Sequence, residues 1–284
     1  MHERLVSLRD ALCNFIDARQ TQSQAHIRLL HWHIVERLVI EGGFDPEAIV
    51  PRPPLRVETS RHAKQRRHRL IHDPDAAVAG ELTILGGLKT KNVDVVVTRP
   101  GIGPCIAVSV KGTLNAFRNL TNRMEEAAGD CTNIHIAYPN LVYGFFHIIR
   151  AGREGEVTNK NDVAVESDGR VVDSIVRYHD AIARLTDRKD VRNDVSRYEA
   201  VCLSLVSTEE STRGRILGAF PPINSPIRFG RFFQTLYDSY DLRYVYTAPA
   251  LRKTTERLFW APDSPAFQAD GASEFEPRIA EAED

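Results

Sequence analysis

The sequence predicts an α/β fold in which a mixed central sheet is flanked by helices. Two patterns support this prediction. Between residues 76 and 149, β-branched and apolar runs alternate with stretches of helical periodicity, as expected where helices cover a sheet. The first 40 residues also show apolar positions at helical spacing. With 284 residues, of which 42% are hydrophobic and 26% charged, the chain can bury one substantial core with additions.

The individual elements follow from local pattern. Apolar spacing and flanking glycines predict helices over residues 3–18, 25–40, 76–88, 113–128, 171–186 and 228–240. β-Branched or apolar character predicts strands over residues 91–98, 105–111, 133–139, 141–149 and 197–207. A turn at 99–104 joins the first two strands into a hairpin.

Charge is balanced overall but clustered locally. The net charge is −1, so any affinity for nucleic acid must come from local basic groups. Within 52–72 a single acid, Glu58, is outnumbered by basic residues: Arg52, Arg56, Arg61, Lys64, Arg66, Arg67 and Arg69. The segment 262–284 is acidic and is expected to be disordered.

Cysteine usage and hydropathy point to the cytoplasm. Four cysteines form neither a CxxC pair nor a disulfide-like framework, and the first residues lack the apolar core of a signal peptide. The most apolar run, 141–149, is about half the roughly 20 residues that a membrane-spanning helix needs. We therefore expect a reduced, cytoplasmic protein without a membrane segment.

The candidate chemistry centres on one acid and one lysine. Asp94 lies among valines on a strand with apolar residues on both sides, where a carboxylate is costly unless it is paired or binds a cation. Lys111 ends the partner strand of the same hairpin. Mg²⁺ takes carboxylate and phosphate oxygens, and a lysine can position water or stabilise charge on phosphate. Alternation along the strand would put a second acid at position 109, but Ser109 stands there.

This arrangement resembles the PD-(D/E)xK nuclease superfamily, and within it type II restriction endonucleases whose second carboxylate has moved to the following helix. In that subgroup Ser-x-Lys is followed, after about thirteen residues, by Glu. Here Ser109-Val110-Lys111 is followed, after residues 112–124, by Glu125. We prefer Glu125 to Glu126, which lies about 100° round the helix. The pattern departs from the family at Val93, which stands where proline precedes the aspartate, while the literal Pro-Asp at 74–75 falls in a loop.

The resemblance implies a restriction-endonuclease-like core and a Mg²⁺-dependent endonuclease that cuts double-stranded DNA. Asp94 and Glu125 would bind the metal, and Lys111 would position or activate water. Glu81, expected on the helix before the hairpin, would support the metal, although Glu125, Glu126 or Glu81 can complete the site. A homodimer and a cognate DNA methyltransferase are implied by resemblance only. DNA contacts are assigned to Arg118, Arg123, Arg61, Lys64, Arg66, Arg67 and Arg69.

Four segments follow from this interpretation: a helical N-terminal section with the basic segment (1–72), the nuclease core (73–152), an α/β completion with possible DNA-recognition elements (153–261) and the acidic tail (262–284). Other interpretations stay open. The same core serves structure-specific and repair nucleases, and a non-catalytic DNA-binding module can retain it. Asp94 and Lys111 can also form a structural ion pair. The H-x-H at 31–33 places its two histidines about 200° apart on a helix, which argues against a shared metal.

Overall fold

The computed structural model describes residues 3–18, 24–62, 65–114, 116–157 and 159–280. Its centre is a six-stranded sheet with strand order β1-β6-β7-β8-β10, to which β9 adds by pairing with β8. The strands are β1 (Ile49–Val50), β6 (Val95–Arg99), β7 (Gly103–Thr113), β8 (Val142–Arg153), β9 (Val163–Val165) and β10 (Ala200–Ser207). The pairs β1/β6 and β6/β7 are antiparallel, whereas β7/β8, β8/β10 and β8/β9 are parallel. The sheet is therefore mixed, as the sequence predicted.

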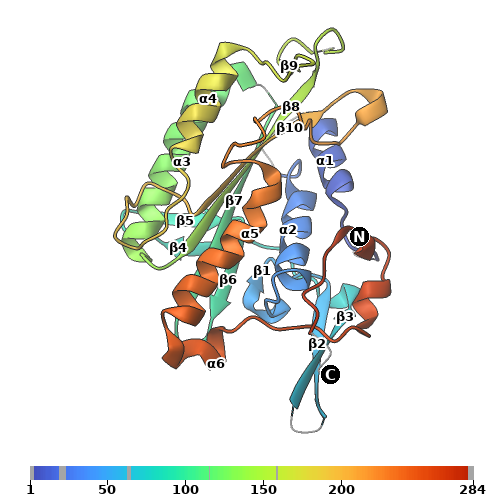
Figure 1. Cartoon of the computed structure of the whole chain (residues 1–284), viewed down its shortest axis with the longest axis vertical. Coiled ribbons are helices and arrows are strands. Elements are labelled where there is room, and N and C mark those ends of the chain that lie inside the picture. The colour runs from blue at the N-terminus through green and yellow to red at the C-terminus, as the bar shows by residue number, and fades with distance from the viewer. Residues whose placement is uncertain (1–2, 19–23, 63–64, 115, 158, 281–284) are drawn as a thin grey trace.

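Helices cover both faces of this sheet (Figure 1). The helices are α1 (Leu8–Asp17), α2 (Arg28–Ile40), α3 (Ala116–Ala137), α4 (Asp173–Ala183), α5 (Phe229–Tyr240) and the short α6 (Arg252–Thr255). Alternate strand residues separate the core into two apolar clusters, because successive side chains point to opposite faces. Val95 and Val97 join α1, α2 and α5 in one cluster, whereas Val96 joins α3 and α4 in the other. Among the described residues, no helix combines the length and apolarity needed to cross a membrane.

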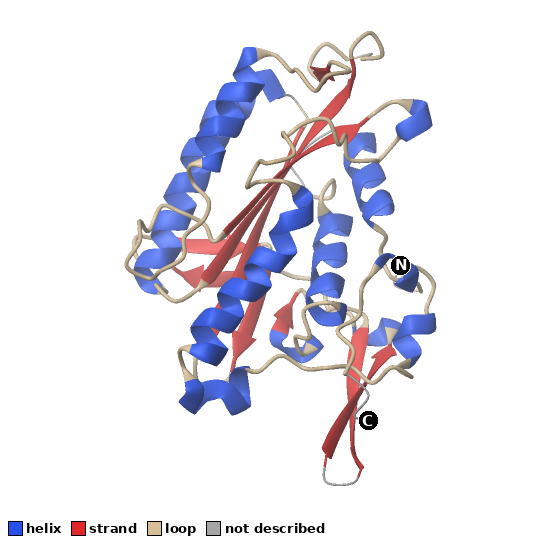
Figure 2. Cartoon of the chain, viewed as in Figure 1, coloured by secondary structure: helices blue, strands red, loops and turns tan. Residues whose placement is uncertain are grey.

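Two hairpins lie outside the sheet. Strands β2 (Leu55–His62) and β3 (Gln65–His72) form a long antiparallel ribbon that carries the basic segment and projects from the body of the protein (Figure 2). Strands β4 (Leu82–Leu85) and β5 (Thr90–Val93) form a short hairpin next to α3. Both hairpins are insertions between β1 and β6 of the central sheet.

The helix predicted over 76–88 is wrong, because most of this segment belongs to the β4–β5 hairpin. Only five residues separate Gly80 from Gly86, and each glycine disfavours a helix by about 1 kcal/mol. A segment this short cannot offset the cost of helix nucleation. Cross-strand pairing of Ile84 with Lys91 satisfies the backbone instead. Glu81 therefore lies just before a strand and not on a helix.

The strand predicted over 133–139 is also wrong, because α3 continues through Gly129 to Ala137. The β-branched Ile134 and Ile136 suggested a strand, but only Ile134 is buried and Ile136 is 49% exposed. Cys131 and Ile134 continue the helical stripe that packs on the sheet. The predicted strand over 91–98 is interrupted at Asp94, where β5 ends and β6 begins.

The acidic segment that begins at Pro262 is packed through Ala280, where disorder was expected. Two short 3-10 turns, Pro265–Gln268 and Ala272–Glu274, lie against the body of the protein. Phe275 is buried, and the carboxylate of Glu274 accepts the backbone N–H of Leu8. The segment packs because apolar side chains between the acids are buried. Its overall acidic composition did not indicate this. Residues 281–284 lie outside the described structure.

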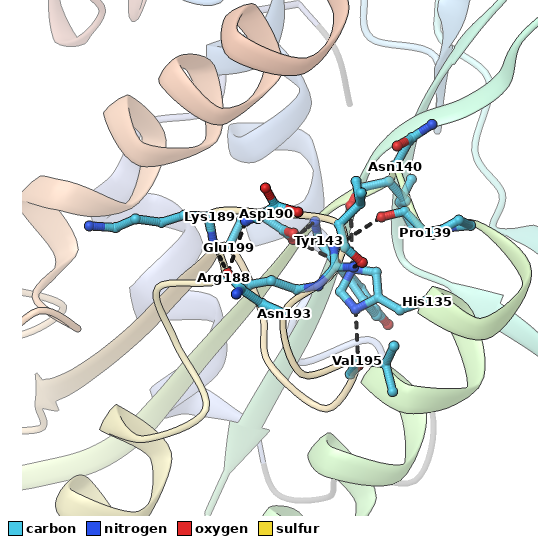
Figure 3. A network of polar contacts seen from close by, with 12 residues as sticks. His135, Pro139, Asn140, Tyr143, Arg188, Lys189, Asp190, Asn193, Val195 and Glu199 are labelled. Carbon is cyan, nitrogen blue, oxygen red and sulfur yellow. Dashed lines mark hydrogen bonds and ion pairs between the residues drawn. The ribbon is translucent and has the colours of Figure 1, made fainter. Parts of the chain in front are cut away.

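A buried charge cluster around Glu199 ties several elements together (Figure 3). The Glu199 side chain is fully buried and lies 2.9 Å from the Arg188 guanidinium and 2.6 Å from that of Arg243. Its carboxylate also accepts the backbone N–H of Tyr143 at 2.6 Å, and His135 lies 3.5 Å away. Burial alone would raise the pKa of Glu199, but His135, Arg243 and the Tyr143 N–H outweigh it, so the pKa is lowered. The cluster joins α3, β8 and the start of β10 to the turn after α5.

Candidate active site

Asp94 occupies the junction between β5 and β6 and is almost completely buried, with 3% of its surface exposed. The backbone N–H of Val110 on β7 donates to Asp94 Oδ2 at 2.7 Å. This bond holds the carboxylate beside the end of β7, one residue before Lys111. Burial raises the pKa of Asp94, and the Val110 N–H and the charge of Lys111 offset this rise only in part. A nearby cation would therefore stabilise the charged form of Asp94.

Lys111 points from β7 towards α3. The alternation of strand side chains puts Ser109 and Lys111 on the face that α3 covers. The side chain of Lys111 is 19% exposed, and its Nζ lies 3.3 Å from Glu126 Oε1 on α3. The structure thus brings together the strand acid, the strand lysine and one helix acid.

That helix acid is Glu126, whereas the sequence favoured Glu125. Glu125 is exposed and faces away from the sheet. Glu126 contacts Lys111 and also lies 2.5 Å from Arg123. Burial alone would raise the pKa of Glu126, but the surrounding cations, Lys111 first among them, lower it. Glu126 is therefore held as a carboxylate.

The rotation of α3 about its axis explains why Glu126, and not Glu125, reaches the site. The helix turns its apolar stripe, which includes Leu120, Ala127 and Cys131, onto the sheet. Residues 123, 126 and 130 recur at three- and four-residue spacing along one edge of that stripe, next to the strand ends. Glu125, which the spacing after Lys111 favoured, lies on the solvent side. A charged residue at the edge of the apolar stripe reaches the site.

A second lysine, which sequence reasoning missed, also contacts α3. Lys91 on β5 has its Nζ 2.5 Å from Asp130 Oδ2 and 3.9 Å from Glu126 Oε1. Asp130 is 4% exposed, so this ion pair is largely shielded from water. Glu126 and Asp130 are four residues apart on a helix, and this spacing was the available signal. The pair anchors the β4–β5 hairpin to α3.

The helix that reaches Asp94 is α2, through His31. His31 Nε2 lies 3.8 Å from Asp94 Oδ1, and the histidine is 6% exposed. Burial lowers the pKa of His31 to about 4; the charge of Glu81 acts in the opposite direction, and those of Lys111 and Arg28 act in the same direction as burial. Glu81 lies in the loop before β4 and influences His31 only through its charge. The sequence analysis considered His31 only together with His33 and did not predict its position beside Asp94.

The two histidines of the H-x-H pattern diverge, as the helical geometry predicted. His33 Nδ1 lies 2.8 Å from the carbonyl oxygen of Val6, and its ring lies 5.4 Å from that of Phe275. It therefore belongs to the packing of the N-terminal section. Only His31 points towards the acid.

A glycine lets this part of the chain approach β7 closely. A Cβ atom on Gly112 would lie 2.7 Å from the Phe15 ring and 2.9 Å from Ile27. Any larger residue would push the start of α2 away from the strand. Gly112 therefore helps to bring α2, and with it His31, to the end of β7 beside Lys111.

On the other side of Lys111, a buried histidine stiffens the strand ends. His147 lies opposite Lys111 in the parallel register of β7 and β8. Its ring nitrogens contact the hydroxyls of Thr113 at 2.8 Å and Tyr178 at 2.5 Å. Burial, with the charges of Arg123 and Lys111, lowers the pKa of His147 to about 3. This neutral histidine joins β7, β8 and α4.

The basic residues assigned to DNA separate into two groups. Arg61 and Arg66 are exposed and lie directly opposite each other on the β2–β3 ribbon. Arg67 and Arg69 lie 2.7 and 3.6 Å from the Asp263 carboxylate. Lys64 and the side chain of Arg118 lie outside the described residues, and Arg123 is engaged by Glu126.

We tested the donors around Asp94 for their fit to a divalent cation. Within the described residues, no group of three or more His, Cys, Asp or Glu side chains is arranged to hold a metal ion. Mg²⁺, however, is commonly held by only one or two carboxylates together with substrate phosphates. Around Lys111 the described acids Asp94, Glu126 and Asp130 equal the cations Lys91, Lys111 and Arg123 in number, and around His31 the charges of Arg28 and Lys111 oppose that of Glu81. The features that fit an added cation are the buried Asp94 carboxylate, whose pKa is raised, and His31 Nε2, which has no hydrogen-bond partner among the described residues.

No protein-family model matches the chain, and neither a curated protein nor a solved structure shows significant similarity to it.

Proposed function

We propose that this protein is a metal-dependent endonuclease that hydrolyses phosphodiester bonds in double-stranded DNA. The observation that carries the proposal is the meeting of Asp94, Lys111 and Glu126 at the end of the β6–β7 hairpin. A strand acid, a lysine on the partner strand and an acid on the next helix are the combination that gives the sequence its resemblance to PD-(D/E)xK nucleases. The mixed sheet with helices on both faces is compatible with a restriction-endonuclease-like core.

The roles follow from the environment of each group. Asp94 and Glu126 would hold Mg²⁺, with Glu81 in support, and the ion would polarise a scissile phosphate and a bound water. Asp94 is fixed by the Val110 N–H, so its second oxygen is the available one. Lys111 contacts Glu126 and acts on Asp94 electrostatically, and as an ammonium it can orient the attacking water and stabilise negative charge on the phosphate.

The identity of the helix acid supplies a direct test. Glu126→Gln is expected to slow the cleavage of duplex DNA in the presence of Mg²⁺ by about a hundredfold or more, because a ligand and the partner of Lys111 are lost together. Glu125→Gln is the matched control, one residue away on the same helix, and is expected to retain wild-type activity. The measurement is the initial rate of plasmid cleavage by purified protein, with and without a chelator. Equal rates for the two variants would contradict this assignment of the site.

The β2–β3 ribbon is the proposed grip on DNA. Two arginines directly opposite each other on paired strands repel, so Arg61 and Arg66 favour an anionic partner between them. A two-stranded ribbon also has the dimensions to enter the major groove. Asp263 already neutralises Arg67 and Arg69 in part, so these two contribute less.

Removing Arg61 and Arg66 together is therefore expected to weaken duplex binding and to reduce the slope of log K against log salt by about 2. The Arg67→Ala/Arg69→Ala pair is the control and should change the slope less. Fluorescence anisotropy with a labelled duplex at several salt concentrations measures both. A larger effect from the control pair would remove the ribbon tip as the grip.

A second candidate is a DNA-binding module without catalysis. It is favoured by the ion pairs that already engage Glu126 with Lys111 and Arg123. Salt-sensitive binding of duplex DNA without hydrolysis under any divalent cation would support it.

Site-specific cutting, a homodimer and a partner methyltransferase follow from the resemblance to type II restriction enzymes alone. Products with defined ends would separate that class from structure-specific or repair nucleases.

A further inference from the structure

The side chain of His31 faces the carboxylate of Asp94. The histidine enters from α2, is 6% exposed, and its Nε2 has no hydrogen-bond partner among the described residues. Buried nitrogen atoms are normally hydrogen-bonded, because an unsatisfied polar group costs about 1–3 kcal/mol. The atom that faces this nitrogen is Asp94 Oδ1, the carboxylate oxygen that does not accept the Val110 N–H.

The separation of these two atoms is informative. At 3.8 Å, His31 Nε2 and Asp94 Oδ1 are too far apart for a hydrogen bond. With bonds of about 2.1 Å, one metal ion puts an imidazole nitrogen and a carboxylate oxygen about 3.0 Å apart at a right angle and about 4.2 Å apart when they lie opposite each other. The observed separation lies within this range, so one cation can bridge the two atoms at a wide angle. The charge of Glu81 acts on His31 in the sense that favours a bound cation, whereas the charges of Lys111 and Arg28 oppose it.

We propose that His31 is a nitrogen ligand of the catalytic metal ion and shares it with Asp94. This inference rests on the proposed nuclease function, since it adds a ligand to the same metal site. An imidazole ligand favours Mn²⁺ and later transition metals, whereas an all-oxygen site suits Mg²⁺. The site is therefore expected to bind Mn²⁺ more tightly than Mg²⁺, with His31 responsible for most of the difference. Phosphate oxygens and water would complete the coordination.

Mn²⁺ provides a test that is independent of cleavage. Mn²⁺ titration of the purified full chain, followed by electron paramagnetic resonance, reports affinity, and pulsed measurements report nitrogen hyperfine coupling from a bound imidazole. The wild type is expected to show this coupling. His31→Gln should lose it and bind Mn²⁺ about tenfold or more weakly, while Mg²⁺ affinity, measured by competition, changes less. His33→Gln is the matched control, two residues away on the same helix, and should retain the coupling.

The outcomes separate this inference from the function on which it rests. Mn²⁺ that binds in an Asp94-dependent manner but shows no coupling dependent on His31 would overturn the ligand assignment and leave the nuclease proposal standing. The absence of any Mn²⁺ binding that Asp94→Asn removes, with or without added inorganic phosphate, would overturn both. Circular dichroism checks that each variant folds. If His31→Gln does not fold, His31→Ala serves as a second variant.

Discussion

Lys111→Met is expected to lower the rate of Mg²⁺-dependent DNA cleavage by about a thousandfold, the largest effect that we anticipate on activity. Lys111 is the only side chain of the described β7 strand that brings a positive charge to Asp94 and Glu126. Methionine keeps the length of the side chain and removes the ammonium. The variant should still fold, because Arg123 and Lys91 continue to neutralise Glu126.

The control for this substitution is Lys89→Met, an exposed lysine at the turn of the nearby β4–β5 hairpin. It should cleave at the wild-type rate. Duplex binding by Lys111→Met, measured by anisotropy in Ca²⁺, should stay within a few fold of the wild type, which would locate the loss in the chemical step. Cleavage by Lys111→Met at more than a tenth of the wild-type rate would rule out the proposed role of this ammonium.

Glu199→Gln is expected to lower the free energy of unfolding by about 3–5 kcal/mol, the largest effect that we anticipate on stability. The carboxylate neutralises Arg188 and Arg243, all three side chains being buried (Arg188 and Glu199 are labelled in Figure 3). An amide keeps the shape but leaves two guanidinium groups without a counter-charge in a region that excludes water. The backbone N–H of Tyr143 can still find an acceptor, so the loss is chiefly electrostatic.

Glu166→Gln provides the comparison. Glu166 pairs with Arg170 at 2.6 Å, but the arginine side chain is 72% exposed, and such pairs contribute about 0–1 kcal/mol. Urea unfolding followed by circular dichroism measures both variants. Similar losses of stability for Glu199→Gln and Glu166→Gln would show that burial does not strengthen the Glu199 cluster.

The sequence was sufficient where the signal was local. The β6–β7 hairpin could be predicted because β-branched runs flank a glycine-containing turn, and its pairing brings Asp94 next to Lys111. It failed where packing overrode local pattern. Apolar spacing and a closing glycine pair suggested a helix over 76–88, yet the segment between glycines was too short and a hairpin formed. Apolar, β-branched residues around Ile134 suggested a strand, yet the preceding helix continued because its apolar stripe was already on the sheet.

Residue types and the hairpin pattern by themselves determined that a carboxylate and an ammonium lie on neighbouring strands. Only the tertiary structure decided which acid of α3 meets Lys111, and that His31 of α2 meets Asp94. The apolar contacts of a helix with the sheet set the rotation of the helix about its own axis. That rotation decides which of two neighbouring acids faces the site and which faces solvent. The approach of α2 depends on distant packing, including the space left by Gly112.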